Sequence, residues 1–214
     1  VLPEVLARIK NLFDLYCEPK AVYETLQVMN TLQPGLCVLG TRLPGCFNVF
    51  EMSVRAVLGQ QITVKAASTL AARLVAVYGT QVQTGIEGLT HSFPAPAAIL
   101  ALGENISEHL GKLGIISARA NTIYQLARVL ADEKNDFGFC GNPEEEMQKL
   151  QAIRGIGSWT AQYIAMRAMG WPDAFLPTDA GKALPDHTPK ELQVLSEAWR
   201  PWRSYATVNL WNTL

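Results

Sequence analysis

Helical periodicity is the feature that most limits how this chain can fold. Apolar residues recur at the three- and four-residue spacing of amphipathic helices, whereas the alternation typical of strands is scarce. Short loops, such as HSFPAPA and GWPDAFLPTDAGKALPDH, separate the periodic segments without a low-complexity linker. The pattern predicts an all-α body. We predict helices over Glu4–Tyr16, Lys20–Asn30, Val49–Tyr78, Ser107–Leu113, Ala118–Asp132, Pro143–Ile153, Trp159–Met169, Pro189–Trp199 and Ser204–Trp211.

Two helix starts are marked by capping sequences. In Asn142-Pro143-Glu144-Glu145 and in Thr188-Pro189-Lys190-Glu191, a capping side chain is followed by Pro at the first helical position and Glu at the third. These signals predict structure and carry no information about function.

Composition limits the class of protein. The 214 residues carry a formal net charge of −1 and a pI of about 6.4, which argues against a polybasic protein that coats nucleic acid. A smaller surface that contacts nucleic acid is still compatible with this charge. The four cysteines, Cys17, Cys37, Cys46 and Cys140, are scattered without a C-x-x-C pair, so neither a zinc site nor a disulfide framework is indicated.

Location is predicted from what the sequence lacks. No apolar run approaches the roughly 20 residues of a membrane span, and the first residues do not resemble a signal peptide. We therefore expect a soluble protein of the reducing cytosol. Since residue 1 is Val and not Met, we also expect the chain to be processed or cut from a longer protein.

A glycine pair interrupts the helical pattern in RGIGSWTA. Gly155 and Gly157 allow backbone angles that other residues resist, and they bring main-chain N–H groups to the start of the helix near Ser158. Unpaired amides and the helix dipole there form an anion site, suited to one phosphate of a nucleic acid backbone. Such a contact positions a protein without reading sequence. The alternative is a glycine-rich turn that binds nothing.

Two aromatic residues and a carboxylate follow the glycine pair. Trp159 and Tyr163 are four residues apart, so they share one face of the predicted helix. Asp179 stands in Phe175-Leu176-Pro177-Thr178-Asp179, 20 residues after Trp159, where a returning loop could bring it back to the start of that helix. The alternatives are that the aromatic pair is ordinary core and that Asp179 caps the next helix or lies in a solvated turn.

The stretches IRGIGSWTAQY and FLPTD resemble the signature of the helix-hairpin-helix DNA glycosylase superfamily. Within it, the chain is most similar to the bacterial 3-methyladenine DNA glycosylase II family, and residues 42–79 and 199–211 support this similarity. The resemblance implies two helical lobes with a cleft between them. One lobe comprises residues 1–47 and 172–214, and the other comprises residues 48–171 with the helix-hairpin-helix at 144–169.

The resemblance also implies roles for individual residues. Asp179 would be the catalytic carboxylate, and Trp159, Tyr163 and Trp211 would line the base pocket. The amides of Gly155, Ile156 and Gly157 would contact the DNA backbone. The carbonyls of Gln151, Ile153 and Gly155 would face an alkali cation, Na⁺ or K⁺. Arg119 would lie near DNA and Arg203 would be structural.

One position predicts the reaction type. Bifunctional members of the superfamily carry a lysine two residues after the second hairpin glycine, where it forms a Schiff base with the sugar. Trp159 occupies that position here, so the resemblance implies a monofunctional enzyme that leaves an abasic site. The four-cysteine run of the relatives with an iron–sulfur cluster is also absent, and no cofactor is expected.

Other positions depart from the family pattern. Gln61 stands where a leucine enters the vacated base stack, Thr178 replaces a second acid, and Asn212 replaces an aromatic residue. The additional amino-terminal domain of the family is expected to be missing before Val1. These departures leave the substrate range open.

The predicted function is therefore hydrolysis of the N-glycosidic bond of alkylated bases, of the 3-methyladenine and 7-methylguanine type, in double-stranded DNA. We expect a monomer in the bacterial cytoplasm, at the nucleoid. Two alternatives remain: a non-catalytic DNA-binding module, and a glycosylase for a neutral lesion such as hypoxanthine or uracil.

Overall fold

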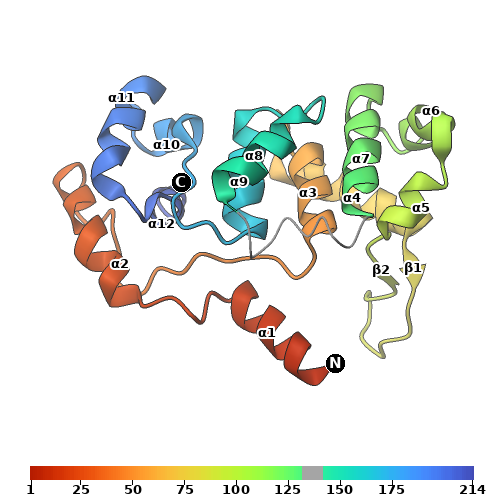
Figure 1. The fold of residues 1–214 in the computed structure, drawn as a ribbon, viewed down its shortest axis with the longest axis horizontal. Helices are drawn as coiled ribbons and strands as arrows, with labels where there is room; N and C mark the ends of the chain where they lie inside the picture. The colour runs from red at the N-terminus through yellow and green to blue at the C-terminus, as the bar shows by residue number, and fades with distance from the viewer. Residues whose placement is uncertain (132–141) are drawn as a thin grey trace. The chain divides into compact units, whose positions relative to one another are not determined.

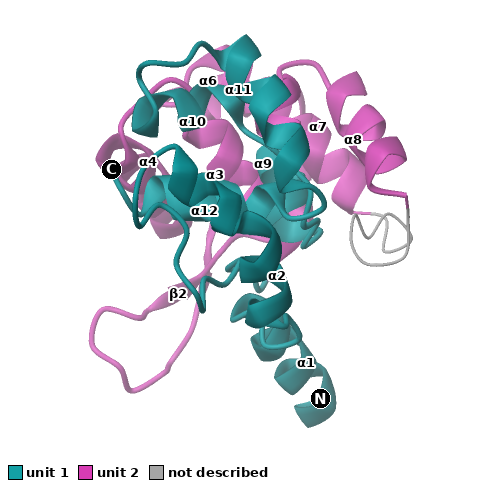
Figure 2. Cartoon of the chain, turned by 90° about the vertical axis from the view of Figure 1, so that its left-hand side faces the viewer, with its two compact units in different colours: residues 1–47, 162–214 teal, residues 48–161 magenta. Residues whose placement is uncertain are grey.

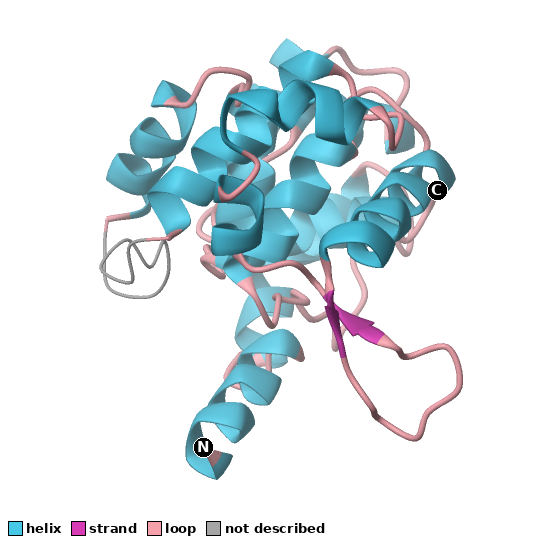
Figure 3. Ribbon diagram, turned by 90° about the vertical axis from the view of Figure 1, so that its right-hand side faces the viewer, coloured by secondary structure: helices cyan, strands magenta, loops and turns pink. Residues whose placement is uncertain are grey.

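The fold is helical almost throughout, as predicted. The structure is a computed structural model that describes residues 1–131 and 142–214 (Figure 1). Within the described residues, strand is confined to a short antiparallel pair, β1 (Thr80–Gln81) and β2 (His91–Ser92), at the base of a loop (Figure 3). No described helix has the length and apolar character that crossing a membrane requires.

The chain divides into two compact units (Figure 2). Unit 1 comprises residues 1–47 and 162–214, and unit 2 comprises residues 48–161. The resemblance implied divisions after residues 47 and 171, and the structure has them after Phe47 and Ala161. The second division falls inside α9 (Ser158–Ala168), so this helix begins in unit 2 and ends in unit 1.

Unit 1 is built from both ends of the chain. Leu26, Met29 and Leu192 are fully buried in its core, and α10 packs against α11 and α12. The amphipathic first helix buries none of its residues. Besides the end of α9, the elements are α1 (Leu2–Leu12), α2 (Pro19–Leu26), η1 (Gln27–Thr31), α10 (Pro177–Ala183), α11 (Pro189–Leu195), η3 (Ser196–Trp199) and α12 (Arg203–Trp211).

Unit 2 packs around α7. This helix contacts α3, α5 and α6, and it buries Ile123 and Leu126 completely. Besides the strands and the start of α9, the elements are α3 (Val49–Leu58), α4 (Val64–Tyr78), α5 (Pro96–Leu100), η2 (Gly103–Asn105), α6 (Ile106–Gly111), α7 (Ser117–Leu130) and α8 (Pro143–Ala152). The predicted end of α7 at Asp132 and the thiol of Cys140 lie outside the described residues.

The predicted helix over Val49–Tyr78 is wrong, because the chain forms two helices there. Gly59 ends α3, Gln61 adopts a positive φ of 55°, and the Thr63 hydroxyl accepts the Ala66 amide at 3.2 Å to cap α4. The apolar periodicity continues across this break, which hides the turn from a pattern search. Thr63 is the local signal that marks it.

The loop expected after α9 also contains a helix. Pro177 starts α10, which places Asp179 in the first helical turn. Both predicted capping sequences are confirmed. The Asn142 side chain accepts the Glu144 amide, and Thr188 and Glu191 form a reciprocal capping box.

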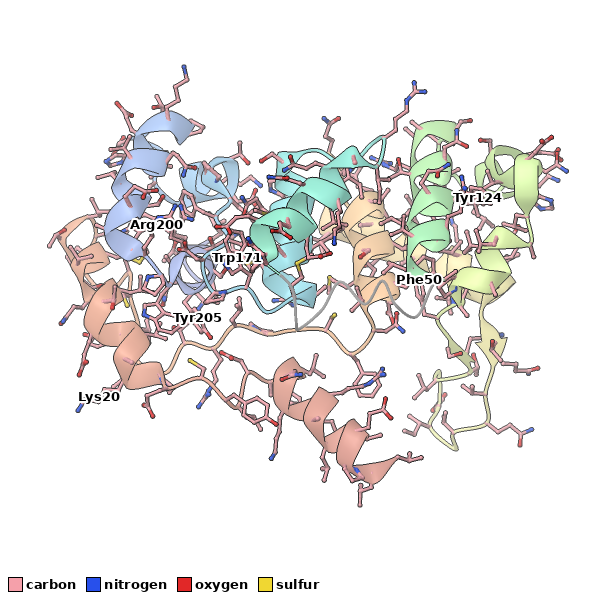
Figure 4. All side chains as sticks on the ribbon, in the orientation of Figure 1. Lys20, Phe50, Tyr124, Trp171, Arg200 and Tyr205 are labelled. Atoms are coloured by element: carbon pink, nitrogen blue, oxygen red, sulfur yellow. The ribbon has the colours of Figure 1, made fainter. Side chains whose placement is uncertain are left out.

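A buried ion pair ties the loop before α10 to α12. Arg203 is 6% exposed, and its Nε and Nη2 donate to the two carboxylate oxygens of Asp173 at 2.7 and 2.9 Å. Arg200, labelled in Figure 4, adds a further bond to Asp173 from the end of η3. Two-point pairing of a buried carboxylate with arginine is the geometry that offsets desolvation best. Arg203 is therefore a structural residue, as predicted.

Candidate functional site

The hairpin turn requires glycine at position 155. Its φ is +96°, a region that residues with a Cβ rarely adopt, and a Cβ built there would lie 2.0 Å from the Thr122 hydroxyl oxygen. The Ile156 amide donates to the Ile153 carbonyl at 3.0 Å, and the Ile156 side chain is buried. The turn between α8 and α9 is thus held closed by its own backbone and anchored by Ile156.

Gly157 is different. Its φ is not positive, and no atom lies within 4 Å of a Cβ built there. The prediction that both glycines supply unusual backbone angles is therefore correct for Gly155 and wrong for Gly157. Within the described residues, the amides of Gly155 and Gly157 donate no hydrogen bond. These amides and the open space at residue 157, at the start of the 11-residue α9, form an arrangement that can receive an anion.

Two residues that the sequence analysis missed hold this turn from behind. The buried Thr122 hydroxyl lies 2.9 Å from the Arg154 carbonyl and 3.0 Å from the Ala118 carbonyl. The Gln60 side-chain amide donates to the Gly155 carbonyl at 3.0 Å and to the Thr160 hydroxyl at 2.9 Å. The only local signal for Gln60 is its place in a polar pair, Gln60-Gln61, that follows the apolar α3.

Arg119 contacts the main chain of Gln60, one of the two residues that hold the hairpin turn. Its guanidinium donates to the main-chain carbonyl of Gln60 from the first turn of α7. The predicted proximity of Arg119 to DNA stays a prediction, and the observed contact gives the residue a second, intramolecular role.

Asp179 is a buried carboxylate at the start of a helix. It is 8% exposed, so it is neither in a solvated turn nor the cap of α10, whose capping position is Leu176. The Lys182 ammonium lies 2.9 Å from its Oδ1 and is itself mostly exposed. Its Oδ2 accepts no hydrogen bond from the described residues. One carboxylate oxygen of Asp179 is therefore available to a ligand. It lies on a unit-1 helix, α10, that packs against α12.

Two of the three predicted pocket aromatics meet. The rings of Tyr163, in the middle of α9, and Trp211, at the end of α12, lie 6.2 Å apart between centroids at an angle of 52°. Both side chains are half-buried, so each keeps some exposed surface. Trp159, also half-buried, belongs to unit 2, and its place in the same pocket stays a prediction.

The three departures from the family pattern are exposed. Gln61, Thr178 and Asn212 all have open side-chain surface, and none of them packs into a core. Gln61 lies at the turn between α3 and α4 with its left-handed backbone. Its insertion into DNA stays a prediction.

The predicted cation site was assigned to three main-chain carbonyls. The Gly155 carbonyl accepts from Gln60 and the Ile153 carbonyl accepts from Ile156, but a carbonyl oxygen has a second lone pair. These two carbonyls and that of Gln151 therefore fit an alkali ion by donor type, and the site stays a prediction. Among the described residues, no group of three or more His, Cys, Asp or Glu is arranged to hold a metal ion.

A groove of about 870 Å³ lies between α7 and α8 and ends at Gly155. Asn121, Lys149 and Arg154 contribute polar groups to its lining. Since Asp179, Tyr163 and Trp211 take no part in it, this groove is not the predicted base pocket.

The chain belongs to the HhH-GPD superfamily of base excision DNA repair proteins. The model of this family matches residues 54–183, which include the hairpin and Asp179. A second family model, the AlkA N-terminal domain, matches residues 1–48. Residues 1–48 are therefore similar to that amino-terminal domain, and the expectation about what precedes Val1 stays a prediction.

The chain is also similar to individual members of this superfamily. The chain is 37% identical over 215 residues to "DNA-3-methyladenine glycosylase 2" of Escherichia coli, an alignment that covers 100% of this chain and 73% of the relative. It is 39% identical over 216 residues to the "Probable bifunctional transcriptional activator/DNA repair enzyme AlkA" of Mycobacterium tuberculosis, covering 97% of this chain and 42% of that protein. The fold matches the solved 3-methyladenine DNA-glycosylase from Archaeoglobus fulgidus with a TM-score of 0.77 at 22% identity, covering 97% and 73% of the two chains.

Proposed function

We propose that this chain is a monofunctional DNA glycosylase that hydrolyses the N-glycosidic bond of alkylated bases and leaves an abasic site. Family membership and the names of the relatives support this class of activity. The observation that carries the proposal is Asp179: a buried carboxylate in the first turn of α10, inside the family match, with one oxygen that no described residue engages.

Base extrusion is the first step of the proposed reaction. A damaged base inside a duplex is out of reach, so it must leave the stack at a cost of a few kcal/mol. The amides of Gly155 and Gly157, which have no acceptor among the described residues, would hold a backbone phosphate of the partner, double-stranded DNA, during extrusion. The Ile156 amide, predicted to make the same contact, already donates to the Ile153 carbonyl.

Charge would select the base. Alkylation at a purine ring nitrogen makes the base cationic and a good leaving group, so little proton donation is needed. The Tyr163 and Trp211 faces would attract that cation by roughly 0.5 to 2 kcal/mol each, and Trp159 would add a third face. A pocket that selects its base by cation–π stacking would accept several alkylated purines, whereas a pocket that selects by hydrogen bonds would accept fewer.

The carboxylate would act on the sugar. As the glycosidic bond breaks, the sugar becomes oxocarbenium-like, and Asp179 would stabilise that charge or orient a water toward C1′. No lysine stands at position 159 to attack the sugar, since this position is Trp159. If the reaction is monofunctional, borohydride will trap no covalent complex between this protein and the abasic product, and a trapped complex would contradict that part of the proposal.

The central test is base release from methylated DNA. We expect the unaltered protein to free 3-methyladenine and 7-methylguanine, measured chromatographically. Asp179→Asn should slow release by at least about 10²-fold, because the developing charge loses its counter-charge. Binding to a duplex with an abasic-site analogue should change little. Asp186→Asn, an exposed aspartate a few residues further on, is the matched control and should retain activity.

Two outcomes would favour other functions. Binding without release by the unaltered protein would indicate a non-catalytic DNA-binding module. Faster release of hypoxanthine or uracil than of 3-methyladenine would indicate a neutral lesion as substrate. We further propose that the protein acts as a monomer on the DNA of a bacterial cytoplasm.

A further inference from the structure

One side chain links the turn between α3 and α4 to the hairpin. The Gln60 amide uses both of its N–H groups, one toward the Gly155 carbonyl at 3.0 Å and one toward the Thr160 hydroxyl at 2.9 Å. Thr160 is buried in the first turn of α9. The main-chain carbonyl of Gln60 is held in turn by Arg119. All of these contacts lie within unit 2.

The residue that follows carries backbone strain. Gln61 has a φ of 55°, a conformation that costs a non-glycine residue of the order of 1 kcal/mol or more and persists only where neighbouring contacts fix it. Its own side chain is exposed and cannot supply packing. Contacts on both sides hold the turn: those of the Gln60 side chain and carbonyl before Gln61, and the Thr63 hydroxyl, which accepts the Ala66 amide, after it.

We propose that Gln60 is a positioning residue that holds Gln61 in register with the hairpin. Because Gln60 bonds to the carbonyl of Gly155, the exposed Gln61 and the phosphate-binding amides belong to one rigid surface. A duplex that seats a phosphate at the hairpin then meets Gln61 at a fixed distance along the strand. This inference rests on the proposed function, in which the damaged base leaves the stack.

The expected consequence is confined to extrusion. With the link intact, Gln61 can occupy the space that the base vacates without first ordering the turn. Without it, the turn must be ordered at the moment of extrusion, which adds to the barrier. The added barrier should matter most where pairing holds the base in the duplex, and least where a mismatch has already weakened the stack.

The experiment compares substitutions at Gln60 on two substrates. Gln60→Met keeps the volume and removes both donors, and Gln60→Glu replaces them with acceptors that repel the Gly155 carbonyl. We expect either change to slow single-turnover release from a normally paired lesion by about tenfold, the loss typical of such a bond, and to slow release from a mismatched lesion less. Gln27→Met is the matched control, because Gln27 also donates to a carbonyl, that of Glu24, at an exposed site in unit 1.

A double substitution separates positioning from general stability. If Gln60 acts through Gln61, the loss in Gln60→Met with Gln61→Ala should be no larger than in Gln61→Ala alone. Additive losses, equal losses on both substrates, or unchanged release would overturn the inference. Should the Gln60 variants fail to fold in thermal unfolding, Arg119→Gln tests the same link from its other contact, with the same outcomes.

A fluorescence readout keeps this inference distinct from the proposed function. 2-Aminopurine beside the lesion reports extrusion whether or not the bond is cleaved. If the unaltered protein extrudes the base but releases none, the proposed function fails and the variants are still compared by fluorescence. Equal extrusion by the unaltered protein and the Gln60 variants, or no extrusion by any of them, would overturn the positioning role.

Discussion

At the scale of single residues, the two hairpin glycines are glycine for different reasons. Gly155 satisfies the fold, because its backbone is left-handed and Thr122 fills the space where a Cβ would be. Gly157 has an ordinary φ and open space in front of it. A methyl group at residue 157 would meet no protein atom, but it would project into the space where the hairpin is proposed to receive a phosphate.

Alanine substitutions should separate these two reasons. We expect Gly155→Ala to lower the free energy of unfolding by about 1–3 kcal/mol or more, since both strain and overlap with Thr122 must be relieved. Gly157→Ala should leave stability within about 1 kcal/mol or raise it slightly. Its affinity for duplex DNA should nevertheless fall. Chemical denaturation and fluorescence anisotropy measure the two quantities, and a stable Gly157→Ala protein with unchanged affinity would contradict the phosphate contact.

At the scale of helices, the start of α11 couples stability to pH. The Thr188 amide and hydroxyl both bond to the Glu191 carboxylate, at 2.7 and 2.9 Å, and the backbone bond is the larger cause of the lowered pKa of Glu191. A carboxyl group whose pKa is lower in the folded state stabilises the fold above its unfolded pKa. That stabilisation is lost as the pH falls through the folded pKa.

Glu191→Gln should therefore lower the unfolding temperature at pH 7, and the difference from the unaltered protein should shrink as the pH falls below the ordinary glutamate pKa of about 4.3 and vanish once the folded-state carboxylate is protonated. Thermal melts across this range, followed by circular dichroism, provide the measurement. Glu87→Gln, at an exposed glutamate outside the helices, is the control and should show no such difference. A difference in unfolding temperature that persists unchanged at low pH would show that the ionised carboxylate does not contribute to the capping box.

Another contact at this scale connects the predicted site to the rest of unit 1. Asp173 and Arg203 fix the segment that leads from α9 into α10, while Ser204 binds the carbonyls of Trp171 and Ala174 at 2.6 and 3.1 Å. Figure 4 shows Trp171 and Tyr205 among the side chains of this unit.

A second contact of α12 reaches the amino-terminal segment. The Tyr205 hydroxyl donates to Asp14 at 3.0 Å, which attaches α12 to that segment. The α10 helix, which carries Asp179, itself packs against α12, so α12 connects the predicted site to both ends of unit 1.

At the scale of the whole molecule, the charge balance predicts how DNA binding responds to salt. The net charge is −1, and the proposed phosphate contact uses backbone amides, which carry no formal charge. Few counterions should be released on binding. We expect the affinity for duplex DNA to fall by less than about 10²-fold between 50 and 200 mM salt, where a protein with 6 to 10 cationic phosphate contacts loses about 10³ to 10⁵. A salt titration of anisotropy would contradict this if the slope matched six or more contacts.

The helical class, the two capped helix starts and the family could all be predicted from the residues alone, because each depends on local periodicity or on a contiguous motif. The sequence also identified the hairpin, Asp179 and the aromatic residues as candidates. Only the structure shows the local surroundings of these residues. Asp179 is buried on a helix where a loop was expected, and the ring of Tyr163 pairs with that of Trp211.

Tertiary contacts also decided the link through Gln60, which no pattern in one segment reveals. Gln60 contacts residues about 100 positions further along the chain, at Gly155 and Thr160. A glutamine after an apolar helix predicts only a polar surface residue. Its function as a link exists only once α3, α7 and the hairpin have packed together, because its hydrogen-bond partners are set by the fold and not by neighbouring residues.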